Sequence, residues 1–127
     1  MPGSFTDLRV WQNGVKLFLE IHAVTKGFPR EELYGLTSQL RRAAMSIPNN
    51  VAEGKGYNSK KDFVRFLYMA RGSCLEVQSE LMIARELQYL TKETASKLLS
   101  DAFTLGRELN ALISAIESRA RAKGAGA

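Results

Sequence analysis

The sequence predicts an all-α fold, an antiparallel up-down-up-down four-helix bundle that forms a single domain over residues 1–127. Four segments space their apolar residues three and four positions apart, which is the period of one face of an α-helix. The three links between these segments are short, so consecutive helices are expected to lie adjacent and antiparallel. The sequence has no succession of short alternating segments separated by turn signals, which is the pattern of strands.

The first predicted helix covers about residues 6–26, and Gly27 and Pro29 are typical of the end of a helix. The second covers about residues 30–53, since proline is tolerated in the first turn of a helix. Within it, Pro48 cannot donate a backbone hydrogen bond to Ala44, so we expect a kink or a short break at residues 46–49. The predicted core-facing residues of these two helices are Leu8, Trp11, Val15, Phe18 and Ile21, then Leu33, Leu36, Leu40, Ala44, Ile47 and Val51.

The third predicted helix is the longest, at about residues 60–88, and Ser59 with Asp62 fits a capping box at its start. Thr91 is a natural N-cap for the fourth helix, at about residues 92–120, and the Gly- and Ala-rich tail 121–127 is expected to fray. The predicted core-facing residues are Phe63, Leu67, Ala70, Cys74, Val77, Leu81, Ala84 and Gln88, then Leu98, Ala102, Leu105, Leu109, Leu112 and Ile116. Close helix packing would explain some of the glycines inside the predicted helices, which are Gly14, Gly35, Gly72 and Gly106.

Side chains suited to catalysis or metal binding are sparse. His22 and Cys74 are the one histidine and the one cysteine of the chain, so they cannot form a zinc site within a single chain. Glu76 and Glu80 lie one helical turn apart but lack the Glu-x-x-His partner of a di-iron bundle. Cys74 falls at an apolar helical position, where a small buried hydrophobe is expected. We therefore expect no catalytic site, no enzymatic activity, no cofactor and no metal.

The first eleven residues lack the basic start and apolar run of a signal peptide, and they are too polar for a membrane span. A lone cysteine cannot form an internal disulfide, which agrees with a reducing compartment. These observations predict a soluble, cytoplasmic protein with no membrane partner.

The second predicted helix carries a set of polar residues opposite its apolar seam, which we call the polar stripe: Gln39, Arg42, Ser46, Asn49, Asn50 and Glu53. One interpretation is a solvated face, and the other is a subunit interface or binding surface. Uncharged Ser and Asn around a proline are less typical of a plain solvated face than Lys and Glu are.

The net charge of +5 comes from one stretch of the chain. Residues 41–71 hold seven basic residues against two acidic ones, and the remaining residues balance with eleven of each. Basic side chains neutralise phosphates whatever the base sequence, and Tyr57 is placed to stack on a base. The alternative is that such a charge is ordinary for a globular domain. The candidate nucleic-acid-binding residues are Arg41, Arg42, Lys55, Tyr57, Lys60, Lys61, Arg65 and Arg71.

Four ordered motifs resemble a known bacterial family: residues 5–12 (FTDLRVWQ), 28–44 (FPREELYGLTSQLRRAA), 46–54 (SIPNNVAEG), and 63–67 (FVRFL) with 70–73 (ARGS). On these motifs the chain is identified as a member of the 23S rRNA-intervening sequence protein family, also called the four helix bundle protein family. The resemblance covers about residues 5–90, and the fourth helix matches only in pattern.

The resemblance implies an antiparallel four-helix bundle that assembles as a ring-like homopentamer without enzymatic activity. Genes of the family were noted inside sequences that interrupt large-subunit ribosomal RNA genes, and the biological role is largely unsettled. The family is similar to the accessory variability protein of diversity-generating retroelements, a basic pentamer that binds a reverse transcriptase and nucleic acid. Two hypotheses follow: a homo-oligomeric nucleic-acid-binding module, with RNA as the partner, or a scaffold that binds a protein partner.

Overall fold

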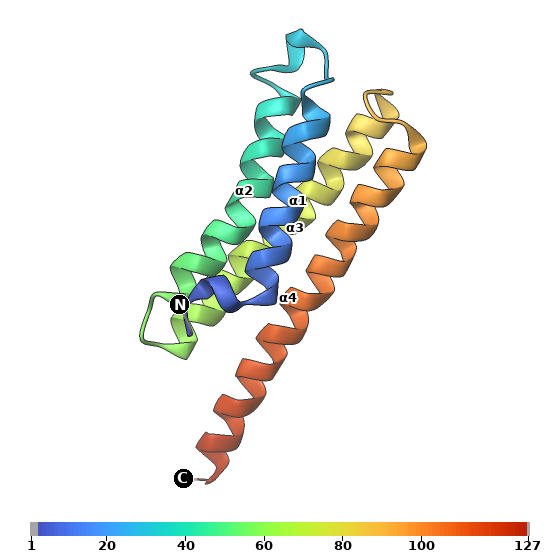
Figure 1. Ribbon diagram of the computed structural model, residues 1–127. Coiled ribbons are helices and arrows are strands. Elements are labelled where there is room, and N and C mark those ends of the chain that lie inside the picture. Colours follow the sequence, from blue (N-terminus) through green and yellow to red (C-terminus); the bar gives the residue numbers. More distant parts are fainter. Residues whose placement is uncertain (1–2, 127) are drawn as a thin grey trace.

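The computed structural model describes residues 3–126, and this part of the chain is entirely helical apart from its turns. Figure 1 shows four α-helices side by side, with consecutive helices running in opposite directions. They are α1 (Arg9–Thr25), α2 (Leu36–Lys55), α3 (Lys60–Glu86) and α4 (Lys92–Gly126). Short 3-10 helices precede α1 and α2, namely η1 (Phe5–Asp7) and η2 (Arg30–Glu32). The predicted all-α four-helix bundle is confirmed.

The core lies between the four helices and follows most of the predicted seams. In α2, Leu40, Ala44, Ile47 and Val51 are fully buried. The seams of α3 and α4 are also buried, except that Phe63 and Leu112 are half-buried and Gln88 lies outside the core. Burial of this continuous apolar surface is the main stabilising contribution to the fold.

The buried face of α1 differs from the predicted one. Val10, Gly14, Leu17 and Ile21 are buried, whereas four of the five predicted residues (Leu8, Trp11, Val15 and Phe18) are only half-buried. The helix is rotated about its axis relative to the predicted orientation because Gly14 packs on α2. A Cβ atom at this position would lie 3.3 Å from Cδ of Pro48. Glycine has no side chain that would mark an apolar position. The predicted face of α1 therefore followed the larger apolar side chains beside Gly14.

The start of α2 also differs from the prediction, because the segment from residue 30 forms η2 and a turn before the helix begins at Leu36. The Glu32 carboxylate accepts a hydrogen bond from the backbone N–H of Leu36 at 3.2 Å and another from the Tyr89 hydroxyl at 2.9 Å. Leu33 therefore lies outside the helix, and it is 45% exposed instead of buried. Farther along, α2 continues through the buried Pro48 without the break that was one of the two expectations.

Two helix ends lie at different residues from those predicted. The helix α3 ends at Glu86, because Gln88 adopts a left-handed backbone (φ 64°) and the N–H of Tyr89 closes the end by donating to Ala84 O at 2.9 Å. At the other end of the chain, α4 extends to Gly126, past the predicted end at about residue 120. Residues 119–123 consist entirely of alanine, arginine and lysine, which are strong helix formers. Ala127 lies outside the described residues.

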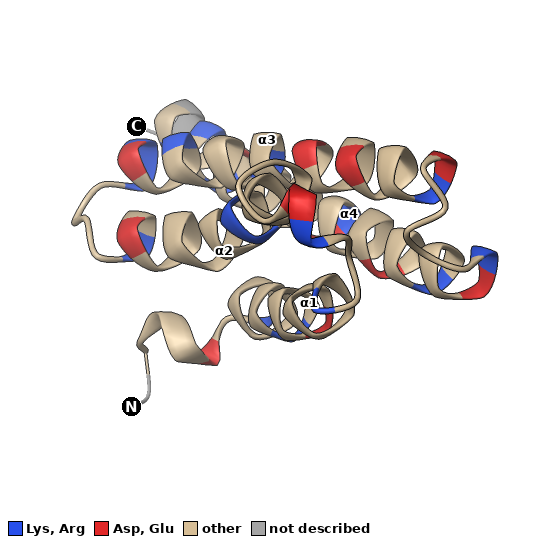
Figure 2. Cartoon of the chain, turned by 90° about the horizontal axis from the view of Figure 1, so that it is seen from above, with Lys and Arg blue, Asp and Glu red and all other residues tan. Residues whose placement is uncertain are grey.

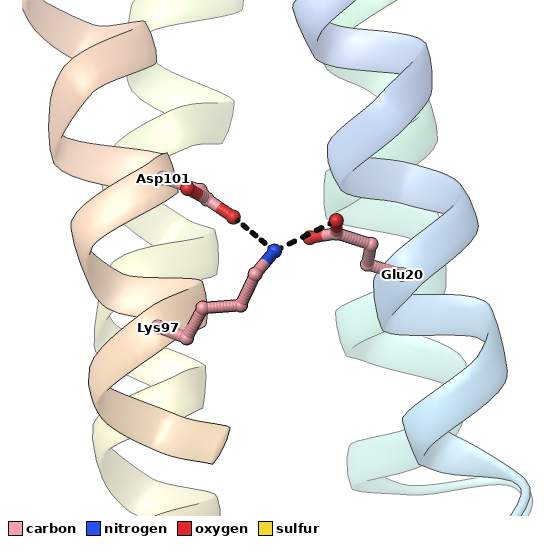
Figure 3. Close-up of polar contacts among 3 residues, drawn as sticks. All are labelled: Glu20, Lys97 and Asp101. Carbon is pink, nitrogen blue, oxygen red and sulfur yellow. Dashed lines mark hydrogen bonds and ion pairs between the residues drawn. The ribbon is translucent and has the colours of Figure 1, made fainter. Parts of the chain in front are cut away.

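Charged residues are distributed along the four helices, and basic positions lie on both sides of the α2–α3 loop (Figure 2). The seam between α1 and α4 is also charged. Lys97 Nζ of α4 lies 2.8 Å from Glu20 Oε1 of α1 and 2.8 Å from Asp101 Oδ2 (Figure 3). The hydrogen bonds to Asp101 and Glu20 raise the pKa of Lys97. This edge of the bundle is thus joined by exposed polar contacts as well as by the core.

Glu80 carries a buried carboxylate oxygen without a partner on the α2-facing side of α3. Its Oε1 atom is covered and accepts no hydrogen bond. Burial is the main cause that raises the pKa of Glu80; Glu76 adds to it and Arg42 opposes it. Because the folded chain holds this proton more tightly than the unfolded chain, ionised Glu80 weakens the fold as the pH rises above about 4.3, its ordinary pKa.

We therefore expect Glu80→Gln to raise the free energy of unfolding at pH 7, by less than about 1 kcal/mol because the side chain is only half-buried. The gain should disappear near pH 4, where Glu80 of the wild type is protonated. Urea denaturation at both pH values measures this difference. Glu53→Gln, at an exposed position, is the matched control and should change stability by less than about 0.5 kcal/mol. Destabilisation by Glu80→Gln at pH 7 would mean that the carboxylate has a favourable ionic partner.

Candidate nucleic-acid interface

The α2–α3 loop and the C-terminal half of α4 meet at one end of the bundle. The helix α2 ends at Lys55, and Ser59 caps α3 by accepting a hydrogen bond from the backbone N–H of Asp62 at 3.2 Å. This bond is half of the predicted capping box; the Asp62 carboxylate lies 3.6 Å from Arg65 instead of returning to the cap. The loop is therefore short and anchored, which fixes the positions of the lysines on either side of it.

A cavity of about 430 Å³, which we call the end pocket, opens between these elements. Its charged lining residues are Lys55, Lys60 and Arg119, all exposed, and no carboxylate of the described residues lines it. Lys61 and Arg65 are exposed in the first two turns of α3 beside it. We call these five cations the basic end of the bundle. The N-terminus of α3 adds the positive end of its helix dipole to their field.

Aromatic rings hold two of these cations in place. Lys55 Nζ lies 5.7 Å from the centre of the Phe63 ring, and the Arg65 guanidinium lies 4.6 Å from that of Phe66. Tyr57, in the loop, stacks on Phe66 with the ring centres 5.3 Å apart. Such contacts orient long side chains while their charged groups stay in water. The basic end therefore presents charge and aromatic surface together.

Arg119 was not among the sequence-predicted site residues. Figure 1 shows that α4 extends past the α2–α3 loop near the far end of the chain. Arg119 of this helix lines the end pocket. Arg121 and Lys123 follow on the same exposed extension. The signal in the sequence was the basic run of residues 119–123, which begins in the last turn of the predicted fourth helix and continues into the predicted tail.

The predicted basic set divides into two groups in the structure. Lys55, Tyr57, Lys60, Lys61 and Arg65 come together at the basic end, whereas Arg41, Arg42 and Arg71 lie elsewhere. Along α2, the helical rise of about 1.5 Å per residue places Arg42 roughly 20 Å from Lys55.

The outlying arginines have partners within the chain. Arg41 Nε donates to Thr25 Oγ1 at 2.8 Å, which ties α2 to the end of α1. Arg42 donates to Gln39 Oε1 at 2.6 Å on the exposed side of α2. Arg71 donates to Asn110 Oδ1 at 3.0 Å and lies 4.7 Å from the centre of the Tyr68 ring. Of the three, Arg41 in particular is placed to stabilise the fold, through its hydrogen bond to Thr25.

The polar stripe is also divided. Ser46 is half-buried, and its Oγ atom hydrogen-bonds to Ser73 of α3 and to Ala43 O. Asn50 Nδ2 donates to Ser46 O at 2.8 Å, so this side chain is bonded to its own helix. Gln39, Arg42, Asn49 and Glu53 remain exposed. Two members of the stripe thus contribute to local structure, and the other four form a surface.

A surface that the predicted seams did not single out lies on the outer side of α3. Its members, Tyr68, Met69, Leu75, Met82, Ile83 and Leu87, are large apolar residues that are 36–57% exposed. Leu75, Met82, Ile83 and Leu87 also line a shallow cavity of about 600 Å³. The signal in the sequence is that α3 is apolar around most of its circumference. We call these six residues the outer α3 face.

The described residues offer little for chemistry inside the bundle. Within residues 3–126, no group of three or more His, Cys, Asp or Glu side chains is placed to hold a metal ion. Cys74 is buried, as expected, and burial raises the pKa of its thiol while a hydrogen bond from Gln78 opposes this. A raised thiol pKa leaves little reactive thiolate. In the same part of the chain, none of the helices combines the length and the apolar character that crossing a membrane requires.

Comparison with known proteins gives one family and one fold. The model of the family described as 23S rRNA-intervening sequence protein matches residues 6–111. A crystal structure from Bacteroides thetaiotaomicron, described as a protein of unknown function from the S23 ribosomal protein family, superimposes with a TM-score of 0.77 at 22% identity. The match covers 83% of this chain and 95% of that one, and it shows a shared fold. No curated protein matches the chain. Neither description names an enzymatic activity.

Proposed function

The chain belongs to the 23S rRNA-intervening sequence protein family, and from this membership and the basic end we propose that it is a non-enzymatic, homo-oligomeric module that binds nucleic acid, specifically RNA. The observation that carries the proposal is the clustering of five exposed cations around the end pocket. They come from three helices, α2, α3 and α4, that are distant in sequence.

The basic end suits a polyanion because its cations are exposed and four of the five have no carboxylate partner among the described residues. Among the five, the ion pair is that of Arg65 with Asp62, at 3.6 Å between exposed side chains. Exposed ion pairs of this kind contribute about 0–1 kcal/mol and give way readily to a phosphate. Tyr57 adds a ring on which a base can stack. Binding of this kind depends on phosphate neutralisation and is therefore strongly dependent on salt.

Assembly strengthens the proposal, because every copy adds a net charge of +5 and one basic end. We propose a pentamer, as the family resemblance implies. The polar stripe and the outer α3 face are the surfaces available for subunit contacts. Light scattering at micromolar concentration tests the assembly: a particle of 14.1 kDa, the mass of one chain, would contradict it.

A salt titration tests the RNA-binding proposal. The affinity of the wild-type protein for a fluorescently labelled RNA hairpin is measured by anisotropy between about 50 and 300 mM KCl. Five phosphate contacts predict that log Kd rises with log salt concentration with a slope of roughly 3.5–4.5. A slope near zero, or no binding at about 50 mM KCl, would contradict the proposal.

A second candidate function, a scaffold for a protein partner, is favoured by the outer α3 face. Large exposed apolar patches commonly mark protein–protein contact sites. A pull-down from nuclease-treated lysate separates the candidates. Stoichiometric retention of another protein that is lost in a Leu75→Lys, Met82→Lys variant favours the scaffold, provided that this variant has the same mass in solution as the wild type.

A further inference from the structure

The end pocket has an apolar wall behind its cationic rim. The wall comes from the segment before α1, from α3 and from α4, and it includes one of the core residues of the bundle. Its side chains are half-buried or buried: Leu8, Phe63, Leu112 and Ile116. Phosphate neutralisation by itself needs no such wall, since exposed lysines and arginines achieve it on a flat surface. The pocket therefore fits a ligand that has a flat apolar part and an anionic group.

We propose that the end pocket receives a single unpaired nucleotide of RNA, with its base against the apolar wall and its phosphate among Lys55, Lys60 and Arg119. This assignment rests on the proposed function and specifies the form of RNA that the site prefers. The cavity of about 430 Å³ lies within the range of roughly 300–1,000 Å³ that is usual for small-ligand sites. A base in a continuous duplex is paired and stacked, whereas a bulged or terminal nucleotide can turn its base outward.

Tyr57 and Asn58 complete the lining with groups that suit a base. Tyr57 stacks on Phe66, yet the residue remains 47% exposed and borders the pocket. The exposed Asn58 amide carries both hydrogen-bond donors and an acceptor, which the edge of a base can use. Stacking of one base on an aromatic side chain changes affinity by about tenfold or more.

Three RNA hairpins with the same stem test the assignment. One is fully paired, one has a single bulged 2-aminopurine nucleotide, and one has an abasic bulge that keeps the phosphate and lacks the base. At about 100 mM KCl, the wild-type protein should bind the 2-aminopurine bulge about tenfold more tightly than the paired hairpin. The abasic bulge should bind within about twofold of the paired hairpin, and 2-aminopurine fluorescence should change on binding as the base enters the pocket.

Leu112→Trp fills the pocket without changing its charge. This variant should lose the preference for the bulged base while its affinity for the paired hairpin stays within about twofold of the wild-type value. Tyr57→Ala, at an exposed position, should reduce the same preference and provides the test if Leu112→Trp does not fold.

The outcomes separate this assignment from the proposed function. Equal binding of the three hairpins by the wild type overturns the assignment and leaves RNA binding intact. If folded Leu112→Trp and Tyr57→Ala both keep the preference for the bulged base, the base binds elsewhere, and the assignment is again overturned. If the wild-type protein binds none of the three hairpins, the proposed function is overturned as well.

Discussion

Charge reversal at the basic end, by the triple variant Lys60→Glu, Lys61→Glu, Arg65→Glu, is expected to weaken RNA binding by about 100-fold or more at roughly 100 mM KCl. Each cation lost from a phosphate contact lowers the salt slope by about one, so the slope should fall by about three. The three positions are exposed, and within the described part of the chain their one ion pair joins Arg65 to Asp62 across exposed surface, so the fold should be retained. Fluorescence anisotropy with the labelled hairpin measures both quantities.

The matched control moves the same charge change to the opposite end of the bundle. Lys26, Arg30 and Lys92 are exposed and lie near the end of α1, in η2 and at the start of α4, at the end where Figure 1 shows the α1–α2 and α3–α4 connections. The variant Lys26→Glu, Arg30→Glu, Lys92→Glu should weaken binding by less than about tenfold, because it alters only the long-range field. Equal losses for the two variants would mean that RNA responds to net charge and does not bind at the basic end.

Gly54→Ala is expected to destabilise the protein by about 1–2 kcal/mol. A Cβ atom at this position would lie 2.6 Å from Cβ of Phe66 and 3.3 Å from Phe63 O. Both atoms are held by the backbone of α3, so the end of α2 must move away from α3 to relieve the contact. Overpacking of this kind costs about 1–3 kcal/mol. The better helix propensity of alanine, up to about 1 kcal/mol, offsets part of that cost.

Gly72→Ala is the control with the opposite expected sign. Gly72 is exposed in α3, and a Cβ atom there would meet no neighbouring heavy atom within 4 Å. The substitution should therefore stabilise the protein by up to about 1 kcal/mol. Thermal denaturation followed by circular dichroism compares the two variants. A Gly54→Ala variant as stable as Gly72→Ala would mean that α2 and α3 do not approach closely at this point.

The fold could be predicted from the sequence because its main determinant is local. Apolar residues spaced three and four apart identify the buried sides of α2, α3 and α4, and short turns restrict how these helices can be arranged. The buried side of α1 could not be predicted in this way. It depends on the contact between Gly14 of α1 and Pro48 of α2. This contact joins two helices, and the spacing of apolar residues in neither helix indicates it.

The candidate site was predictable only in part, for the same physical reason. Lys55, Lys60 and Lys61 are neighbours in the sequence, so their clustering was visible there. Arg119 reaches the end pocket because of the length and direction of α4, which are properties of the assembled bundle. The spacing of basic residues in the sequence also does not indicate that Arg41 forms a hydrogen bond with Thr25 of α1.

Hydrogen exchange in the presence and absence of the RNA hairpin tests the central claim, RNA binding at the basic end, most directly. We predict slower exchange of backbone amides in residues 55–65 and 117–124 when RNA is bound, because the exposed loop and helix extension become covered there. The polar stripe before residue 50 and the outer α3 face should keep their exchange rates at a constant oligomeric state. Slower exchange on those two surfaces alone, or no change anywhere at saturating RNA, would contradict the claim.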